Sequence, residues 1–329
     1  MKQFLIRRWF LIGLAVVLLA GLLGAKSLRP LSEMKLLRDG LVACVLFVMA
    51  LPLRAVDLWQ TVRRPLAPLL AVAVNFGLLP LFAWGLAGAV LTPMMAAGVY
   101  VAAATPCTLA SAAVWTRRAG GNDGIAILVT ILTNSSCFVV TPLWLYVTAG
   151  QTETNVPPLS QMIGKLAVLV VLPMLLAQLC RVHKRVAEVA TAGKTLLGIV
   201  AQTGILTMVL FGAIKSGLSL TGSGESLRAL ECLKMLIVIL TIHISMWFAA
   251  GALGRLCRLS RPDWIAVSFA GSQKTLMVGL QVALDSGITI LPMVSYHVGQ
   301  LIVDTFLADR LKWSGSEQER GAAQRRAER

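Results

Sequence analysis

The residues best suited to chemistry in this chain are a few polar side chains inside otherwise apolar segments. Lys274 is the most informative of them, because no other charged residue lies between Asp263 and Asp285. A lysine near the middle of a bilayer costs at least ~2.5–3.5 kcal/mol on insertion scales, so its ammonium should face the protein interior. An ammonium held there can balance an anionic solute or take the place of a bound cation.

Two stripes of polar residues point to the same kind of buried site. Residues three and four apart share a face of a helix, so each stripe should line one face. The first stripe is Thr130, Thr133 and Asn134, and the second is His297, Gln300 and Asp304. His297 falls at about the depth of Lys274 and could relay a proton to or from it.

Pro106 should interrupt a membrane helix, because it lacks an N–H and its ring clashes with the carbonyl four residues earlier. We expect Thr105 to cap a second half-helix that has Pro106 in its first position. A second interruption is expected near Gly271–Lys274. Lipid cannot satisfy the backbone groups that a break frees, so both breaks must face protein or water. Paired interrupted segments are typical of the central site of a transporter.

The composition is that of a polytopic membrane protein, with 57% apolar and 14% charged residues among 329 and a mean hydropathy of +0.78. The net charge of +15 comes from short basic clusters between apolar segments. This distribution is typical of membrane-protein loops and argues against nucleic-acid binding. Ten apolar segments approach the ~20 residues that a bilayer requires. They lie at approximately 9–25, 38–54, 66–91, 94–117, 124–148, 160–180, 195–217, 230–254, 263–284 and 287–311.

The chain reads as one transmembrane unit, residues 1–313, followed by a polar tail at 314–329 that we expect to be disordered and cytoplasmic. Ten segments form two sets of five, at about 1–150 and 151–313, and the odd number inverts the second set. The first segment could be a cleaved signal peptide, although Leu23 lies poorly for cleavage and favours a retained helix. The side that carries both termini receives about three times as many Lys and Arg residues as the other side. We therefore expect both termini in the cytoplasm and the protein in the plasma (inner) membrane.

These segments resemble the bile acid:sodium symporter superfamily over nearly all of their length. The resemblance is carried by the run from Pro106 through Ser111 and Gly120-Gly121-Asn122 to Thr130 and Asn134, and by Asn75–Trp84. Gly271–Thr275 and Tyr296–Gln300 look more like its divergent, symporter-like branch. The family implies ten helices in two inverted repeats, arranged as core and panel domains, with the broken fourth and ninth helices crossing in the core. It also implies transport of sodium with organic anions such as bile acids, sulfated steroids and small carboxylates.

The family's sodium ligands carry over unevenly. The resemblance implies candidate sodium ligands at Asn75, Ser111, Thr130 and Gln273, since oxygens near unwound backbone suit a hard cation. Phe269 stands where the family has a bridging Glu, and Lys274 replaces the usual Asn, which leaves sodium coupling open. The full set of candidate substrate- or ion-binding residues is Asn75, Thr105, Thr108, Ser111, Asn122, Thr130, Thr133, Asn134, Ser272, Gln273, Lys274, His297 and Gln300.

The sequence favours a secondary active transporter of a small or amphipathic organic anion, with no cofactor except a candidate sodium ion. Our hypothesis is that the Lys274 ammonium occupies the place of a sodium ion and pairs with the substrate anion. Burial disfavours the charged form of a lysine, so binding and release of a proton could replace sodium coupling. Alternatives that remain open are sodium symport, a structural lysine bonded to freed carbonyls, and a membrane sensor that does not transport. An enzyme is disfavoured, because no nucleophile–His–acid set, HExxH motif or P-loop is present.

Five other residues carry weaker expectations. Under the repeat, His243 falls roughly where Asn75 falls, and it could join the site. We expect Lys165 to snorkel toward the membrane surface. Arg117 and Arg118 should anchor the chain at the cytoplasmic face, where they could also gather anions at the inner mouth. We expect Asp123 to cap the fifth helix in preference to binding a cation.

Overall fold

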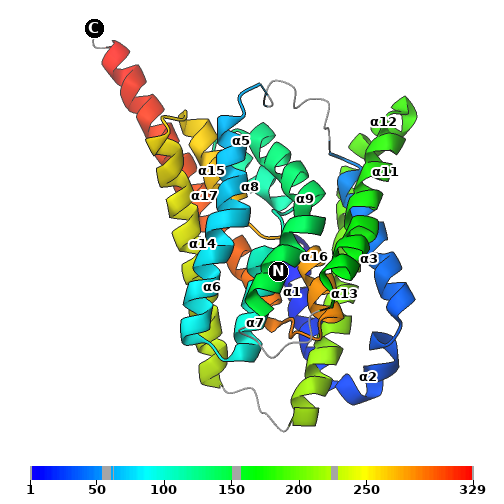
Figure 1. Cartoon of the computed structure of the whole chain (residues 1–329). Helices are drawn as coiled ribbons and strands as arrows, with labels where there is room; N and C mark the ends of the chain where they lie inside the picture. The colour runs from blue at the N-terminus through cyan, green and yellow to red at the C-terminus, as the bar shows by residue number, and fades with distance from the viewer. Residues whose placement is uncertain (1, 54–60, 62, 150–156, 224–228, 328–329) are drawn as a thin grey trace.

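The computed structural model describes residues 2–53, 61, 63–149, 157–223 and 229–327, and within these ranges it is helical and contains no strand (Figure 1). The first half has α1 (Lys2–Leu23), α2 (Ala25–Ser32), α3 (Lys35–Ala50), α5 (Leu66–Ala73), η2 (Val74–Leu78), α6 (Leu79–Val90), α7 (Pro93–Ala104), α8 (Ser111–Arg118) and α9 (Asp123–Ala149). The second has α10 (Leu159–Leu166), η3 (Ala167–Val171), α11 (Leu172–Arg181), α12 (Lys184–Ala192), α13 (Lys194–Ser223), α14 (Ala229–Leu256), α15 (Arg261–Ser272), α16 (Leu276–Asp285) and α17 (Leu291–Ala327). The two η elements are single wide turns inside otherwise continuous helices.

Five helical stretches of the described chain are long and apolar enough to cross a bilayer. They are Leu66–Val90, Asp123–Thr148, Leu159–Arg181, Lys194–Leu218 and Ala229–Leu256. The pair α1 and α2, bent by 104° at Gly24, would count as a sixth. The expected segments 94–117 and 263–284 are each divided into two short helices, so neither contains a single helix long enough to cross a bilayer.

The C-terminal tail differs from its prediction. Residues 314–327 continue α17 as helix, so the expectation of disorder is wrong for them. The tail is rich in Ala, Glu, Gln and Arg, all of which have high intrinsic helix propensity. A helix that is already nucleated in the preceding apolar segment can therefore extend through it.

The helices pack as two groups. The flanking group consists of α1, α2, α3 and α10–α13, in which α13 lies along α1, α2 and α3. The crossover group consists of α5–α9 and α14–α17, in which α15 packs on α5, α8, α9 and α14. The two groups meet where α16 contacts α3 and α13 and where α9 contacts α10 and η3.

Both expected interruptions are present, but the first differs in detail. α7 ends at Ala104, and α8 begins at Ser111 after a non-helical segment. Thr105 has an extended backbone and bonds back to Ala102 of α7, so the prediction that it caps the second half-helix is wrong. Thr108 caps the second half-helix instead, because its Oγ1 accepts the N–H of Ala112 at 3.0 Å. The second interruption separates α15 and α16 at residues 273–275.

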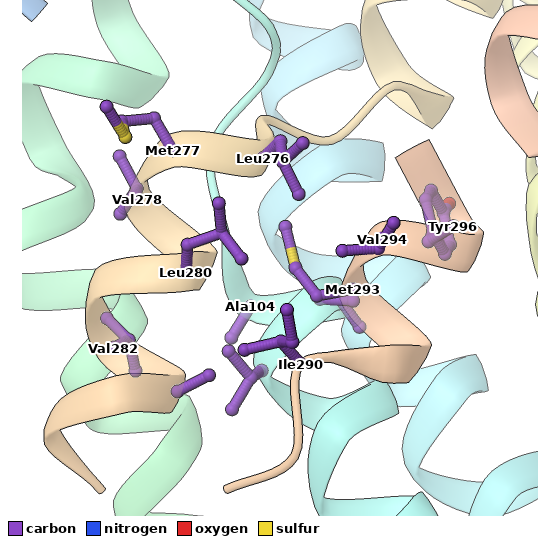
Figure 2. Close-up of a cluster of buried hydrophobic side chains, with 14 of the residues drawn as sticks. Ala104, Leu276, Met277, Val278, Leu280, Val282, Ile290, Met293, Val294 and Tyr296 are labelled. Atoms are coloured by element: carbon purple, nitrogen blue, oxygen red, sulfur yellow. The ribbon is translucent and has the colours of Figure 1, made fainter. Parts of the chain in front are cut away.

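An apolar cluster holds α16 against the beginning of α17 and the end of α7. Figure 2 shows Leu280 and Val282 of α16 near Ile290 and Met293, with Ala104 of α7 beside them. All of these side chains are buried. Gly279 permits this approach, because a Cβ there would overlap the side chain of Met293.

Gly98 on α7 provides a test of this packing. A Cβ at Gly98 would lie 2.5 Å from Cγ of Pro292 and 3.1 Å from the carbonyl oxygen of Thr289. We predict that Gly98→Ala lowers the stability of the purified protein by about 1–3 kcal/mol, the usual cost of overpacking. Gly85→Ala is the matched control, since a Cβ there meets nothing within 4 Å. Equal melting temperatures for the two variants in detergent would contradict the packing.

Candidate functional site

The two interruptions meet in the middle of the crossover group. The N–H of Thr275 donates to the carbonyl of Pro106 at 2.9 Å, which joins them directly. Each break is also held by the long helix that follows the broken pair, α9 for the first break and α17 for the second. Cys107 donates its N–H to Thr133 Oγ1 (3.2 Å) and accepts from Asn134 Nδ2 (2.8 Å). At the second break, the single side chain of Gln300 binds both backbone groups of Lys274. Gln300 Oε1 accepts the Lys274 N–H and Gln300 Nε2 donates to the Lys274 carbonyl, each at 2.9 Å.

Side chains satisfy the carbonyl groups that the first break frees. Thr141 Oγ1 donates to Ala104 O at 2.8 Å. Thr130 Oγ1 donates to Thr108 O at 2.9 Å. Pro106 O and Cys107 O have the partners given above, and Thr105 O accepts from Lys274 Nζ at 2.8 Å. The first break therefore leaves no described carbonyl from 104 to 108 without a donor.

The second break is satisfied in the same way. Asn75 Nδ2 lies 2.9–3.3 Å from the carbonyl oxygens of Ala270, Gly271 and Gln273. Ser272 O accepts from Tyr296 OH at 3.1 Å and lies 3.3 Å from His243 Nδ1. Asn75 therefore caps the end of α15 from a different helix.

The Lys274 ammonium lies at the crossing and is surrounded by oxygens. Its Nζ is 2.6 Å from Asn75 O, 3.1 Å from Asn75 Oδ1 and 2.8 Å from Thr105 O. It also lies 5.5 Å from the centre of the Phe76 ring, within the range of a cation–π contact. The side chain is fully buried. An ammonium with three oxygen acceptors has used all of its N–H donors.

The sequence around Pro80 explains why one of these oxygens, Asn75 O, is available. Pro80 has no N–H, so it cannot donate to Phe76 O, four residues earlier, or to Asn75 O, five residues earlier. The wide turn η2 lies at this point, and the carbonyl oxygens of Asn75 and Phe76 are open to donors from other helices. Lys274 Nζ donates to Asn75 O at 2.6 Å, and Trp144 Nε1 donates to Phe76 O at 2.7 Å.

A second polar chain runs through Gln273. Its Oε1 accepts from Thr108 Oγ1 and Ser111 Oγ, each at 2.9 Å, and its Nε2 donates to Asp304 Oδ2 at 2.5 Å. The other carboxylate oxygen of Asp304 lies 2.9 Å from His243 Nε2. Asp304 and His243 are both fully buried, so a carboxylate lies inside the crossover group with an imidazole and an amide as its partners.

The structure brings together most of the residues that the sequence singled out. Those that meet at the two breaks are Asn75, Thr105, Thr108, Ser111, Thr130, Thr133, Asn134, Ser272, Gln273, Lys274 and Gln300. His297 lies at their edge, where its Nδ1 is 3.1 Å from Gln300 Nε2 and its ring contacts Phe10 of α1 edge-on. Asn122 lies elsewhere. Its Nδ2 donates to Asp263 Oδ1 at 3.0 Å and ties the α8–α9 turn to the beginning of α15.

The candidate binding residues predicted from the sequence omit two residues of the site, Asp304 and His243. Asp304 belonged to the second stripe, and a carboxylate inside an apolar segment is itself a signal of a buried partner. His243 had only its approximate correspondence to Asn75. Tyr296, which also bonds to the second break, gave no signal beyond its place near His297.

Ion pairs involve four of the residues with weaker expectations, namely Arg117, Arg118, Asp123 and Lys165. Arg118 pairs with Asp309 of α17 at 2.6 Å. Arg117 pairs with Asp123 at the beginning of α9, so that carboxylate has a guanidinium partner in addition to its place in the first helical turn. Lys165 also pairs with carboxylates and does not simply extend to the surface.

Two helix breaks that cross inside a bundle of apolar helices, with a buried charge at their contact, are typical of a membrane transporter. Comparison with known proteins agrees. Residues 8–313 match the SBF-like CPA transporter family, and the chain belongs to that family. It is therefore an integral membrane protein of a transporter family and not an enzyme, as the sequence indicated.

Similar proteins are found in animals, plants and bacteria. Sodium/bile acid cotransporter 7 of Danio rerio is 23% identical over 330 residues, covering 95% of this chain and 96% of that protein. The uncharacterized sodium-dependent transporter YocS of Bacillus subtilis (strain 168) is 27% identical over 270 residues, covering 80% and 79%. A probable chloroplastic sodium/metabolite cotransporter, BASS4 of Oryza sativa subsp. indica, is 26% identical over 226 residues, covering 62% and 52%.

Gln300 tests how the second break is held. We predict that Gln300→Ala destabilises the purified protein, because it leaves both the N–H and the C=O of Lys274 buried without a partner. A buried group left unsatisfied costs about 1–3 kcal/mol. Gln202→Ala, on the half-buried surface of α13, is the control. A thermal unfolding experiment in detergent that shows no larger loss for Gln300→Ala would reject this role.

Proposed function

We propose that the protein is a secondary active transporter that carries a small or amphipathic organic anion across the plasma (inner) membrane. In this proposal the crossover group is the core domain and the flanking group is the panel domain, and transport moves one against the other. Membership of the SBF-like family supports a transporter of small solutes. The name of the Danio rerio relative includes bile acid, an amphipathic organic anion, as a solute of that protein.

We propose ten membrane crossings in two inverted repeats, with both termini in the cytoplasm. The fourth crossing would be α7 with α8, and the ninth would be α15 with α16. The two breaks are held by similar hydrogen bonds, which supports the inverted repeat. In each, a side chain of the next crossing donates to the carbonyl of the broken segment, Asn134 to Cys107 and Gln300 to Lys274. The bias of basic residues toward one side supports the orientation.

The contacts of Lys274 support the proposal that its ammonium takes the place of a sodium ion. Three oxygens within 2.6–3.1 Å of one nitrogen resemble the oxygen shell of a bound cation. α7 and α15 both end at this point, and the C-terminal ends of helices carry partial negative charge. A fixed ammonium therefore balances these helix ends without a sodium ion.

The predicted sodium ligands are already engaged, which favours a carrier that does not require sodium at this site. Asn75 Oδ1 accepts from Lys274, and Gln273 Oε1 accepts from two hydroxyl groups. Thr130 donates its hydroxyl hydrogen to Thr108 O. A sodium ion bound here would have to displace hydroxyl hydrogens at Gln273 Oε1 and would lie against the positive charge of Lys274 at Asn75 Oδ1.

The same geometry revises how Lys274 would act on an anion. All three ammonium donors are used, so the charge would favour an anion through its field and not by a direct ion pair. α8 begins at this crossing, where Ala110 is exposed and Ser111 is half-buried. We place the anionic group of the solute near this helix start, whose partial positive charge has the right sign.

Uptake into proteoliposomes tests the proposal. We predict that the protein accumulates labelled taurocholate or, if its solute is small, labelled pyruvate, and that Lys274→Met reduces the rate at least tenfold. The substitution removes the charge and leaves Thr105 O and both Asn75 oxygens without their donor.

Lys194→Met is the matched control, because it makes the same change at an exposed lysine at the beginning of α13. Unchanged uptake in Lys274→Met would reject the role of the lysine. Thermal stabilisation by either anion without any uptake would favour a membrane sensor over a carrier.

A further inference from the structure

A cluster of charged side chains lies at the α2 end of the molecule, which is drawn at the bottom of Figure 1. Arg38, near the beginning of α3, donates to Asp285, at the end of α16, at 2.5 Å. Lys165 of α10 lies 3.0 Å from Asp285 and 3.2 Å from Asp39. Arg38 is only 4% exposed, so this is not an ordinary surface ion pair. The ten residues of α16 carry Asp285 away from the crossing that holds Lys274.

Two further side chains strengthen the cluster. Gln281, one helical turn before Asp285, is fully buried, and its Nε2 lies 2.8 Å from both Asp39 and Asp285. Lys215 of α13 donates to the carbonyl of Leu284, near the end of α16, at 2.5 Å. The cluster therefore fixes the end of α16 to three separate helices, α3, α10 and α13.

The cluster joins the two helix groups. Asp285 and Gln281 belong to the crossover group, whereas Arg38, Asp39 and Lys165 belong to the flanking group. Ser216 of α13 lies at the same boundary, 3.5 Å from the hydroxyl of Thr289 and 94% buried. At the α12 end, by contrast, α11 and α12 pack mainly on α3 and α13 of their own group. The pairs of Arg117 with Asp123 and Arg118 with Asp309 also lie within one group, the crossover group.

We propose that this cluster is an ionic latch that closes the seam between the two groups at the α2 end. The inference rests on the proposed carrier function, in which the groups must part at one end and then at the other. Opening the α2 end requires Asp285 to leave Arg38 and Lys165, and Gln281 to leave Asp39. The described structure is then the state closed at the α2 end, which is the outer end in the proposed orientation.

The charges of the latch suit the proposed cargo. When Asp285 withdraws with α16, the flanking side keeps Arg38, Lys165 and Lys215 against the single carboxylate of Asp39. The opened seam therefore presents a net positive wall, and a solute carboxylate or sulfonate can take the place that Asp285 leaves. In the closed state, Asp285 fills that place and keeps the buried guanidinium of Arg38 paired.

Cysteine labelling measures the seam directly. The probe is Ser216→Cys in a chain whose six native cysteines are replaced by Ala, labelled in nanodiscs with a membrane-impermeant maleimide. We predict that Asp285→Asn raises the labelling rate at this probe at least fivefold. Arg38→Gln should also raise the rate, and the double variant should label no faster than Asp285→Asn, because that change already removes the carboxylate with which Arg38 pairs.

Glu33→Gln is the matched control, since it breaks an exposed pair with Arg29 at the same end of the molecule. It should leave the labelling rate unchanged. A second probe, Ala201→Cys, is buried on α13 and should stay unlabelled in every variant. An unchanged rate in Asp285→Asn, or an equal rise at both probes, would overturn the latch. The assay needs no solute, so the latch can fail while uptake is observed, and uptake can fail while the latch holds.

Discussion

The structure depends on one constraint, which is that broken helices inside a bilayer must find partners for their backbone groups within the protein. A lipid tail offers no hydrogen bond, and each group left alone costs several kcal/mol. The two breaks meet this constraint with a small set of side chains. Thr130, Thr141 and Asn134 complete the first, whereas Asn75, Tyr296 and Gln300 complete the second. These bonds join five helices of the crossover group, so its centre should move as a rigid body.

The charges at the centre follow from the same constraint. Helix ends that converge at a crossing bring partial charges together, and the Lys274 ammonium is held by Thr105 O at the end of α7 and by Asn75 O in the wide turn η2. Asp304 is balanced separately, by His243 and by Gln273, which also reaches the hydroxyls of Thr108 and Ser111. Motion between helix groups is therefore expected at the boundary that Asp285 and Arg38 bridge, and not at the crossing itself.

Much of the site could be predicted because its signals are local. Pro106 implied a break, and polar residues three and four apart implied shared helix faces, which is why Thr133, Asn134 and Gln300 were found. Contacts between residues far apart in the chain gave no such signal. Asp285 pairs with Lys165, 120 positions away, and nothing in the sequence near Lys165 indicates a partner. The sequence likewise contains no signal that Asn75 has two other partners. Its Nδ2 donates to the end of α15, and its Oδ1 accepts from the Lys274 ammonium.

The start of the second half-helix shows a related limit. A proline marks where an amide is missing, but not how many residues the chain needs before it can begin a helix again. Cys107 is held by Thr133 and Asn134, which keeps the chain extended until Thr108 can cap Ala112. At Asn122 the motif resembles the family, but the side chain lies away from the crossing and donates to Asp263 at the beginning of α15.

The most direct test of the central claim is the thermal stability of the purified protein in sodium compared with choline at equal ionic strength. An ion that binds only the folded state adds RT ln(1 + [L]/Kd), about 2.7 kcal/mol at a hundredfold excess over Kd. If Lys274 fills the cation position, the wild-type protein shows no sodium-specific stabilisation, and Lys274→Asn gains one. A sodium-specific rise in the wild-type protein would contradict the account and would return Asn75, Ser111, Thr130 and Gln273 to the role of sodium ligands.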